Sequence, residues 1–430
     1  MSKSLNIAIA GLGTIGGGTF KLLMEQAEIL ERRTGRAIRL VAVADPDASR
    51  LKEAKKNGIR CYADALPMAA EADIDVVVEL IGGSDGIAKK LCEAAIANGK
   101  HVVSANKALI AHHGTALAHA AEDAGVTFAY EAAVAGGIPI IKSLREGLAG
   151  NNIKRVYGIL NGTCNFILSA MSDQSREFED VLKECQQRGY AEADPSFDID
   201  GIDTAHKLAI LASVAFGGEV NFDAVHIEGI RHISPMDMQF AAELGYRIKL
   251  LGIASIRDDG VEQRVHPCMV PETTAIAHVA GSLNAVVADG DFVDSIVLEG
   301  YGAGAGPTSS AVAADIIDIA RGLKVPTFGV PAAQLKTITP VPMQRHFGAY
   351  YIRLMVVDKP GVFADIAGAL KNHAVSMESV LQRTRDPGEA VPVVMTVHKT
   401  EEAAMTKALD EMALVEGVVE EPRMIRIESL

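Results

Sequence analysis

The densest group of chemically useful side chains lies between Gly189 and Lys207, where a Gly-Tyr-Ala-Glu-Ala-Asp-Pro run precedes several acids and one lysine. Asp203 and Lys207 are four residues apart, so on a helix they share one face. The apolar run that follows Lys207 predicts a buried helix. A lysine at the mouth of such a helix is partly desolvated, which favours loss of its proton. That property suits a group that exchanges a proton with an alcohol oxygen during hydride transfer.

The same residues admit a plainer interpretation, in which an acidic loop caps a helix. Asp203 and Lys207 would then form a surface ion pair that contributes about 0.3–0.5 kcal/mol. Further acids precede the helix, namely Asp194, Asp198 and Asp200. Charges rarely gather ahead of a buried helix without a ligand, so we favour the chemical interpretation.

A glycine-rich turn near the N-terminus predicts a dinucleotide site. Gly11, Gly13 and Gly16 form a G-x-G-x-x-G pattern between an apolar strand and a helix. Glycine permits the tight turn and lets backbone N–H groups approach a pyrophosphate at the helix N-terminus. A glycine turn that serves packing alone is the alternative.

Polar side chains at the ends of two other predicted strands extend this site. A carboxylate at Asp45 can accept hydrogen bonds from an adenosine ribose and favours NAD, although a turn with Pro46 is the alternative. Arg50 lies nearby and could serve a 2′-phosphate, so NADP stays open. Ser104 and Lys107 follow the fourth strand, at the edge of a parallel sheet that faces the ligand. Lys107 would then lie near the nicotinamide, unless it is an ordinary exposed lysine.

The elements that must position these groups alternate in the first half of the chain. Apolar strands are predicted at 5–10, 39–44, 75–81, 101–104 and 127–130, with helices at 16–32, 84–98 and 109–124. This alternation predicts an α/β fold with a Rossmann-type parallel sheet at 1–135, completed by about 308–340. The mixed pattern of 136–307 predicts an α+β substrate and dimerisation domain.

A proline-rich linker at 339–342 separates a further α+β unit, 348–430, from the rest. Strands are predicted there at 350–357, 391–398 and 424–428, with helices at 362–372 and 401–412.

Composition excludes several classes of protein. The net charge of −14 repels phosphate backbones, so we expect no nucleic-acid partner. No apolar run reaches the roughly 20 residues of a membrane span, so no membrane partner is expected. The five cysteines are scattered without zinc-ligand spacing and indicate a reducing, cytoplasmic location.

Taken together, these residues resemble the homoserine dehydrogenase family. The stretch from Gly189 to Lys207 reads G-Y-A-x-x-D-P-x-x-D-I-x-G-x-D-x-x-x-K and matches the family pattern throughout. Further matches cover about the first 340 residues: S-A-N-K ending at Lys107, E-A-A-V-A-G-G-I-P from Glu131, N-G-T-C-N from Asn161, and G-A-G-A-G-P-T-S-S-A-V. One departure is Cys185, which stands where the family has a small residue and has no mechanistic consequence.

The resemblance implies reversible, nicotinamide-dependent reduction of L-aspartate 4-semialdehyde to L-homoserine, on the route to threonine and methionine. It makes Lys207 the proton donor to the aldehyde oxygen, and Lys107 an assistant that also holds the substrate near the nicotinamide. Glu192 and Asp203 match positions that grip the amino acid, its ammonium group in particular. Asp198 matches a further acid of the site.

The resemblance also implies two sets of binding residues. The cofactor, NAD or NADP, would touch Gly11, Gly13, Thr14, Ile15, Gly16, Asp45, Ser104, Lys107, Gly189 and Gly306. A structural monovalent cation, expected to be sodium, would be held by Glu131, Val134, Gly136 and Ile138, although these residues by themselves also fit a simple turn. Ala44 replaces the basic residue that usually precedes Asp45, which argues against strict NADP specificity.

The C-terminal unit resembles an ACT domain, a ferredoxin-like α+β fold, through its strand, Asp-Lys-Pro-Gly turn (358–361) and helix. Such domains pair and bind amino acids, so we expect a homodimer or homotetramer and threonine as a possible feedback effector. Because the first strand begins near Leu5, we expect a monofunctional form without a preceding aspartate kinase.

Two rival functions stay open at this point. An aspartate-semialdehyde dehydrogenase needs a thioester-forming cysteine, and no cysteine here has an evident nucleophile context. A non-catalytic sensor of nucleotides and amino acids would leave Glu192, Asp203 and Lys207 unexplained.

Overall fold

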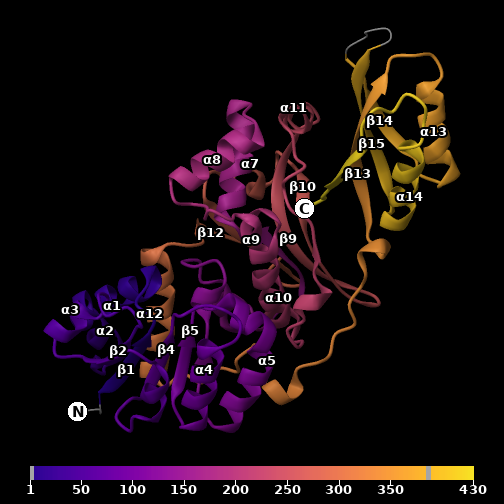
Figure 1. The fold of residues 1–430 in the computed structure, drawn as a ribbon. Coiled ribbons are helices and arrows are strands. Elements are labelled where there is room, and N and C mark those ends of the chain that lie inside the picture. Colours follow the sequence, from indigo (N-terminus) through magenta and orange to yellow (C-terminus); the bar gives the residue numbers. More distant parts are fainter. Residues whose placement is uncertain (1–3, 384–388) are drawn as a thin grey trace.

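The computed structural model describes residues 4–383 and 389–430 of the 430-residue chain. Figure 1 shows a first unit built mainly from the N-terminal part, a second unit beside it and a C-terminal unit beyond the second. Within the described ranges, no helix is long and apolar enough to cross a membrane.

The first unit is a parallel sheet of six strands. In spatial order these are β3 (Arg60–Tyr62), β2 (Ile38–Ala44), β1 (Leu5–Ala10), β4 (Val76–Glu79), β5 (His101–Ser104) and β6 (Phe128–Ala129). Its helices are α1 (Thr14–Glu25), α2 (Ala27–Thr34), α3 (Lys52–Lys56), α4 (Ile87–Ala97) and α5 (Lys107–Asp123). The strand order reverses at β1, and ligands bind at the carboxyl ends of strands at such a point. The predicted Rossmann-type sheet is confirmed.

Two details of this unit differ from the sequence predictions. The single helix expected at 16–32 is two helices, because Gln26 leaves the helical conformation (φ −106°, ψ 15°) and α2 turns Leu30 into the core. Good helix formers surround Gln26, so nothing in the sequence marks the break. The edge strand β3 is too short, at three half-buried residues, to show a periodic pattern.

A late helix, α12 (Ala305–Arg321), packs against α1 of the first unit. Glycine permits this approach, because a Cβ on Gly18 would lie 3.0 Å from the carbonyl oxygen of Ala305 and 2.7 Å from Ser309 Oγ. Thr19 Oγ1 also donates to Ser309 Oγ at 3.1 Å. The first turns of α1 and α12 therefore lie side by side.

The second unit is built on antiparallel strands in the order β12 (Ser295–Tyr301), β11 (Leu283–Gly290), β7 (Ile153–Ile159), β9 (Tyr246–Arg257) and β10 (Gly260–Pro271), with β8 (His226–Ile227) parallel to β10. Its helices are α6 (Ile140–Lys142), α7 (Gly162–Gln174), α8 (Phe178–Gln187), α9 (Ser196–Ile199), α10 (Ile202–Phe216) and α11 (Pro235–Glu243). Helix α10 contacts β7 and β9 and also α5 of the first unit. Every residue from Asp203 to Val214 on it is buried, so the predicted buried helix is confirmed.

The C-terminal unit runs β13 (Phe347–Val357), α13 (Val362–Asn372), β14 (Met377–Leu381), β15 (Ala390–Glu401), α14 (Glu402–Met412) and β16 (Arg423–Ile427). This β-α-β-β-α-β order confirms the ferredoxin-like prediction. Strand β14 is missing from the sequence prediction, because its three central residues are exposed and it carries no apolar alternation.

Strand β16 joins the C-terminal unit to the second unit. It pairs with β13 on one side and in parallel with β10 on the other, where Cys268 is opposite Arg426 and Met269 opposite Ile427. The two sheets are therefore continuous, whereas the sequence indicates a separate unit. Alternation along a strand shows which residues face a core but not which strand lies beside it.

Candidate active site

Asp203 and Lys207 lie on one face of α10, where it meets the end of β7. The helix follows Gly201, whose φ of 86° favours glycine. Lys207 Nζ donates to Asp203 Oδ2 at 2.7 Å and to the carbonyl oxygen of Leu160 at 2.6 Å. The side chains of Lys207 and Asp203 are only 10% and 5% exposed. The ammonium group therefore points into the protein and not into bulk water.

Lys107 reaches the same carboxylate from the first unit. It begins α5, and Asn106 caps this helix by accepting a hydrogen bond from the backbone N–H of Leu109. Lys107 Nζ lies 3.2 Å from Asp203 Oδ1, and its side chain is 33% exposed. One buried carboxylate thus holds two ammonium groups, one from each unit, and Lys107 is the one nearer to solvent.

Asn161 ties two acids of this site together. Its Nδ2 donates to Asp198 Oδ1 and to Asp203 Oδ2, both at 2.8 Å. Its Oδ1 accepts from the backbone N–H of Cys164 at the start of α7, also at 2.8 Å. The end of a helix therefore fixes the amide, and the amide fixes both carboxylates.

The two acids have opposite electrostatic environments. Burial alone would raise the pKa of Asp203, but the charges of Lys207 and Lys107 and the bond from Asn161 outweigh it and hold that pKa well below its usual range. Burial, and then the charge of Asp203, raise the pKa of Asp198. Asp203 is a fixed anion, whereas Asp198 has no ion pair among the residues described and would be stabilised by a cationic ligand group.

Aromatic rings join α5 and α10 beside the lysines. His112 Nε2 and His206 Nε2 are 3.2 Å apart, and His206 stacks on Phe222 and Phe197 with ring centroids 4.4 and 5.6 Å away. Lys107 Nζ lies 5.5 Å from the centroid of the Phe197 ring. Burial, followed by the charges of His112 and Lys107, lowers the pKa of His206 to about 4, so this ring is neutral at pH 7.

A cavity of about 470 Å³ lies at the carboxyl ends of β1, β2 and β4. A Cβ on Gly11 would lie 2.6 Å from the carbonyl oxygen of Leu80, and one on Gly16 would lie 1.8 Å from that of Gly11, so this turn requires glycine. A Cβ on Gly13 would meet only Arg50 Nη1, at 3.8 Å. Helix α1 begins there without a side-chain cap, which leaves backbone N–H groups for an anion.

Asp45 shapes this turn from within. Its Oδ2 accepts from the backbone N–H of Leu12 at 2.7 Å and its Oδ1 from that of Asp47 at 2.8 Å, and the residue is 3% exposed. Arg50 Nη1 lies 3.4 Å from Asp45 Oδ2, and the Arg50 side chain is 51% exposed. Of the two side chains, Arg50 is the more accessible from the cavity.

Comparison with known proteins decides among the functions that this geometry allows. Three family models match in sequence order: Homoserine dehydrogenase, NAD binding domain, at 11–131; Homoserine dehydrogenase at 139–317; and ACT domain at 350–413. A homoserine dehydrogenase from Neisseria gonorrhoeae is 45% identical over 100% of this chain and 99% of its own length. Another, from Pseudomonas aeruginosa, is 43% identical over 100% of both chains.

The chain belongs to the homoserine dehydrogenase family. A solved homoserine dehydrogenase from Thiobacillus denitrificans, 44% identical, matches the fold with a TM-score of 0.93 and covers 99% of this chain and 98% of its own. Membership confirms the predicted class of enzyme, an oxidoreductase that acts on a CH–OH group with NAD(P). The predicted ACT domain is confirmed as well.

The other residues that the sequence predicts for cofactor and substrate binding lie in three different parts of the structure. Ser104 Oγ donates to Glu79 Oε2 at 2.6 Å, at the carboxyl ends of β5 and β4. Gly306 lies in the first turn of α12, beside α1. Gly189 and Glu192 are exposed in the loop before α9, and nothing in 4–383 or 389–430 binds the Glu192 carboxylate.

The residues predicted to hold a cation form a buried turn before α6. The Glu131 carboxylate accepts from the backbone N–H groups of Ile141 and Lys142 at 2.9 and 2.8 Å. Burial, and then the charge of Asp315, raise the pKa of Glu131 to about 8. Val134, Gly136 and Ile138 lie in the same buried turn, where the carbonyl oxygen of Ile138 accepts from the backbone N–H of Ile140 at 2.8 Å. A buried carboxylate among carbonyl groups is a donor set that suits a hard cation.

The sequence analysis missed the contributions of four residues to the site. Asn161 lies in a matched stretch, and its place just before a helix indicates a capping role, but not the bridge between Asp198 and Asp203. Glu79 ends a fully buried strand, which is an unusual place for an acid without a partner. His112 and His206 gave no signal, because 94 positions separate them.

Proposed function

We propose that this homoserine dehydrogenase interconverts L-homoserine and L-aspartate 4-semialdehyde, with Lys207 as the group that exchanges a proton with the substrate oxygen. The buried carboxylate that Lys207 and Lys107 share, at the contact between the two units, carries this proposal. When bound, NAD(P) would supply the hydride chemistry, because its oxidised form accepts a hydride and its reduced form donates one.

Each charged side chain has a distinct role in the proposal. In the direction of reduction, the Lys207 ammonium group gives a proton to the aldehyde oxygen as the hydride arrives, and in oxidation its neutral amine takes the proton back. Asp203 orients Lys207 through both states. Lys107, which is more exposed, holds the substrate near the nicotinamide and returns protons from solvent. Asp198 and Glu192, together with Asp203, bind the substrate ammonium group.

The proposed cofactor site combines the glycine turn with residues at the ends of neighbouring strands. Gly11, Gly13, Thr14, Ile15 and Gly16 bind the pyrophosphate through the N-terminus of α1. The nicotinamide end meets a further set: Ser104, Lys107, Gly189 and Gly306. Because Asp45 is engaged by backbone donors, Arg50 decides whether a 2′-phosphate is tolerated, and both NAD and NADP are accepted.

We also propose a structural sodium ion at Glu131, Val134, Gly136 and Ile138. It would supply the positive charge that a buried carboxylate next to Asp315 needs. Sodium should raise the Tm of the wild type more than potassium chloride of equal ionic strength does, and Glu131→Gln should abolish that difference. Equal effects of the two salts on the wild type would refute this part.

The ACT domain is the proposed site of feedback by L-threonine in a homodimer or homotetramer, located in the cytoplasm. Saturating threonine should change either the activity or the thermal stability. No change in either would exclude threonine as the effector.

The rival thioester mechanism needs a reactive thiol, and the cysteine nearest the site is unsuited to it. Cys164 Sγ donates to the carbonyl oxygen of Asp198 at 3.2 Å, and burial raises the pKa of this thiol well above its usual value. A thiol that stays protonated is a poor nucleophile.

The test is homoserine-dependent reduction of NAD and NADP, followed at the nicotinamide absorbance. Lys207→Met should lower kcat by about 10²–10⁴-fold and leave cofactor binding intact. Lys249→Met is the matched control, because Lys249 is a buried lysine of the same unit whose Nζ donates to the carbonyl oxygen of Val279 and to Asn165 Oδ1. It should lose stability and keep kcat. Turnover retained in Lys207→Met would refute the role of that lysine.

A further inference from the structure

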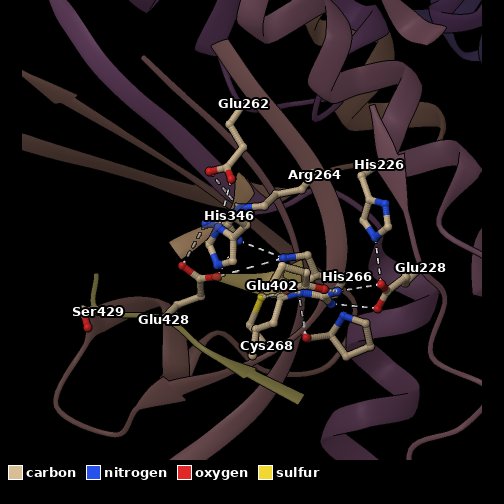
Figure 2. Close-up of polar contacts among 12 residues, drawn as sticks. His226, Glu228, Glu262, Arg264, His266, Cys268, His346, Glu402, Glu428 and Ser429 are labelled. Atoms are coloured by element: carbon tan, nitrogen blue, oxygen red, sulfur yellow. Dashed lines mark hydrogen bonds and ion pairs between the residues drawn. The ribbon is translucent and has the colours of Figure 1, made fainter. Parts of the chain in front are cut away.

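A second group of charges, all buried except Glu228, whose side chain is 34% exposed, lies where β16 enters the sheet of the second unit. We call it the interdomain network, and its members are Glu228, Glu262, Arg264, His266, His346, Glu402, Arg426 and Glu428. Figure 2 labels all of these side chains except Arg426 and shows them converging from β10, the segment after β8 and the C-terminal unit. Both arginines are almost fully buried, with Arg264 at 4% and Arg426 at 2% exposure. Arginine keeps its charge under all ordinary conditions, so each one requires acids around it.

One part of the network resembles a metal site. Atoms of His266, Cys268 and Glu428 that could bind a metal lie within 4.8 Å of one another. However, the Arg264 guanidinium lies between His266 and Glu428, because its Nη1 lies 2.8 Å from His266 Nε2 and also bonds Glu428. A metal cation would have to displace a buried guanidinium from two of the three residues, so we assign those two to the network.

The other arginine connects the C-terminal unit to the second unit. Arg426 on β16 donates from Nη1 and Nη2 to the two carboxylate oxygens of Glu228, both at 2.8 Å. Its Nε donates to Glu402 Oε2, at the start of α14, at 3.0 Å. A guanidinium that bonds both oxygens of a carboxylate fixes its orientation as well as its distance. Arg426 on β16 therefore orients Glu228, whose Oε1 also lies 2.7 Å from His226 Nε2 on the neighbouring β8.

Glu228 belongs to a segment that packs directly on α9. Its backbone N–H donates to the carbonyl oxygen of Val265 at 2.7 Å, and the N–H of Ile230 donates to that of Ile199 at 2.9 Å. A Cβ on Gly229 would lie 2.3 Å from the Ile199 oxygen and 2.6 Å from Asp200 Cα. No side chain fits there, so the backbone of 228–230 is in close contact with the last turn of α9.

Helix α9 carries a residue of the proposed active site. Asp198 immediately precedes Ile199, and its Oδ1 accepts from the same Asn161 amide that holds Asp203. A displacement of segment 228–230 therefore moves the backbone beside Asp198. The route from the C-terminal unit to the substrate acids is short: Arg426, Glu228, the backbone of 229–230, Ile199 and Asp198.

We propose that Glu228 is a positioning residue for the substrate site, and that Arg426 sets its place. The C-terminal unit thereby fixes α9 and Asp198 for binding the substrate ammonium group. This inference rests on the proposed function, and it names the contact through which a change in the ACT domain reaches the substrate.

The test compares two buried arginines that cross from the C-terminal unit to the second unit. Arg353 on β13 donates from Nε to Asp237 Oδ1 on α11 at 2.7 Å, and its side chain is 8% exposed against 3% for Arg426. Arg426→Gln should raise the KM for L-homoserine about tenfold, with a smaller change in kcat and none in cofactor affinity. Arg353→Gln should leave this KM unchanged. Arg426→Lys, which keeps the charge and loses the paired geometry, should be intermediate.

A second variant leaves every charge in place. Gly229→Ala should raise the same KM, because the added methyl group pushes on the Ile199 carbonyl oxygen. An unchanged KM in Gly229→Ala, or equal effects of Arg426→Gln and Arg353→Gln, would overturn the proposal. If Arg426→Gln does not fold, Gly229→Ala decides the outcome alone.

Hydrogen exchange of the backbone amides of 196–201 separates this inference from the proposed function. Exchange there should be faster in Arg426→Gln than in Arg353→Gln, whether or not the enzyme turns over homoserine. Exchange equal to that of the wild type in Arg426→Gln would exclude the contact. A wild type without homoserine turnover would refute the proposed function instead.

Discussion

Two buried groups of charges in this protein use different cations. The substrate cluster (Asp198, Asp203, Lys207, Lys107 and Asn161) has two lysines around one carboxylate. In the interdomain network, two arginines are surrounded by acids, and most of its side chains are at most a few per cent exposed. Lysine can release a proton when its surroundings change, whereas arginine cannot.

The two groups also differ in exposure to solvent, and the lysines of the substrate cluster are more exposed than the arginines of the network. Lys107 is 33% exposed and Asp198 is half-buried, so the substrate cluster is open on one side. In the network, both Arg264 and Arg426 bond two acids each. An open pair of lysines suits chemistry, whereas two arginines that are closed off from solvent suit the attachment of one unit to another, even though Glu228 beside them is 34% exposed. Substitutions in the substrate cluster should therefore act mainly on activity and those of Arg264 mainly on stability, whereas substitution of Arg426 should act on the KM through Glu228.

The largest expected effect is on activity in the substrate cluster. Asp203→Asn removes the carboxylate that holds Lys207 and Lys107. We expect kcat/KM for L-homoserine to fall roughly 1000-fold, equivalent to about 4 kcal/mol of transition-state stabilisation. Steady-state kinetics measures this.

Asp198→Asn is the control, because it leaves both lysines paired with Asp203, and it should act mainly on KM. A larger loss of kcat in Asp198→Asn than in Asp203→Asn would contradict the roles proposed for these acids.

Loss of Arg264 from the interdomain network should lower the stability of the protein. Arg264→Met leaves Glu428 buried without its guanidinium and removes one of the two that bond Glu262, which should lower the free energy of unfolding by about 3–5 kcal/mol. Denaturant unfolding reports the loss, and kcat should stay within about twofold of the wild type where the variant is folded. A variant of full stability and low kcat would contradict the separation of the two groups.

The smallest effect is a dependence on pH beside the substrate cluster. The pKa of His206 is about 4 in the folded protein against a reference value of 6.5, so its contribution to stability is complete above about pH 6.5 and is lost as the pH falls towards 4. Between pH 7 and pH 5 the wild type should lose about 1–2 kcal/mol through this ring. His206→Gln should lose correspondingly less, as thermal unfolding at the two pH values will show. An identical loss in both proteins would rule this contribution out.

Local patterns in the sequence predict most helices and strands and are the basis for the proposed reactive residues. The parallel strands are continuous apolar runs, and Asp203 and Lys207 share a helix face because of their spacing. Lys107 followed from its place at the end of a strand, but its contact with Asp203 did not, because 96 positions separate the two residues in the sequence.

What the sequence could not predict depends on contacts between distant segments. The pairing of β16 with β10 and the bonds from Arg426 to Glu228 join the end of the chain to its middle. Asp45 shows a different limit, since its type and position suit a ribose contact, while its carboxylate accepts backbone N–H groups of the turn. A residue type narrows the possible partners, and only the fold selects among them.

The kcat of Lys207→Arg tests most directly whether Lys207 passes a proton or only places a positive charge in the site. Arginine keeps the charge and does not release its proton at neutral pH. We predict that kcat for homoserine oxidation falls at least about 1000-fold while cofactor affinity stays within about threefold. A kcat within tenfold of the wild type would contradict the account.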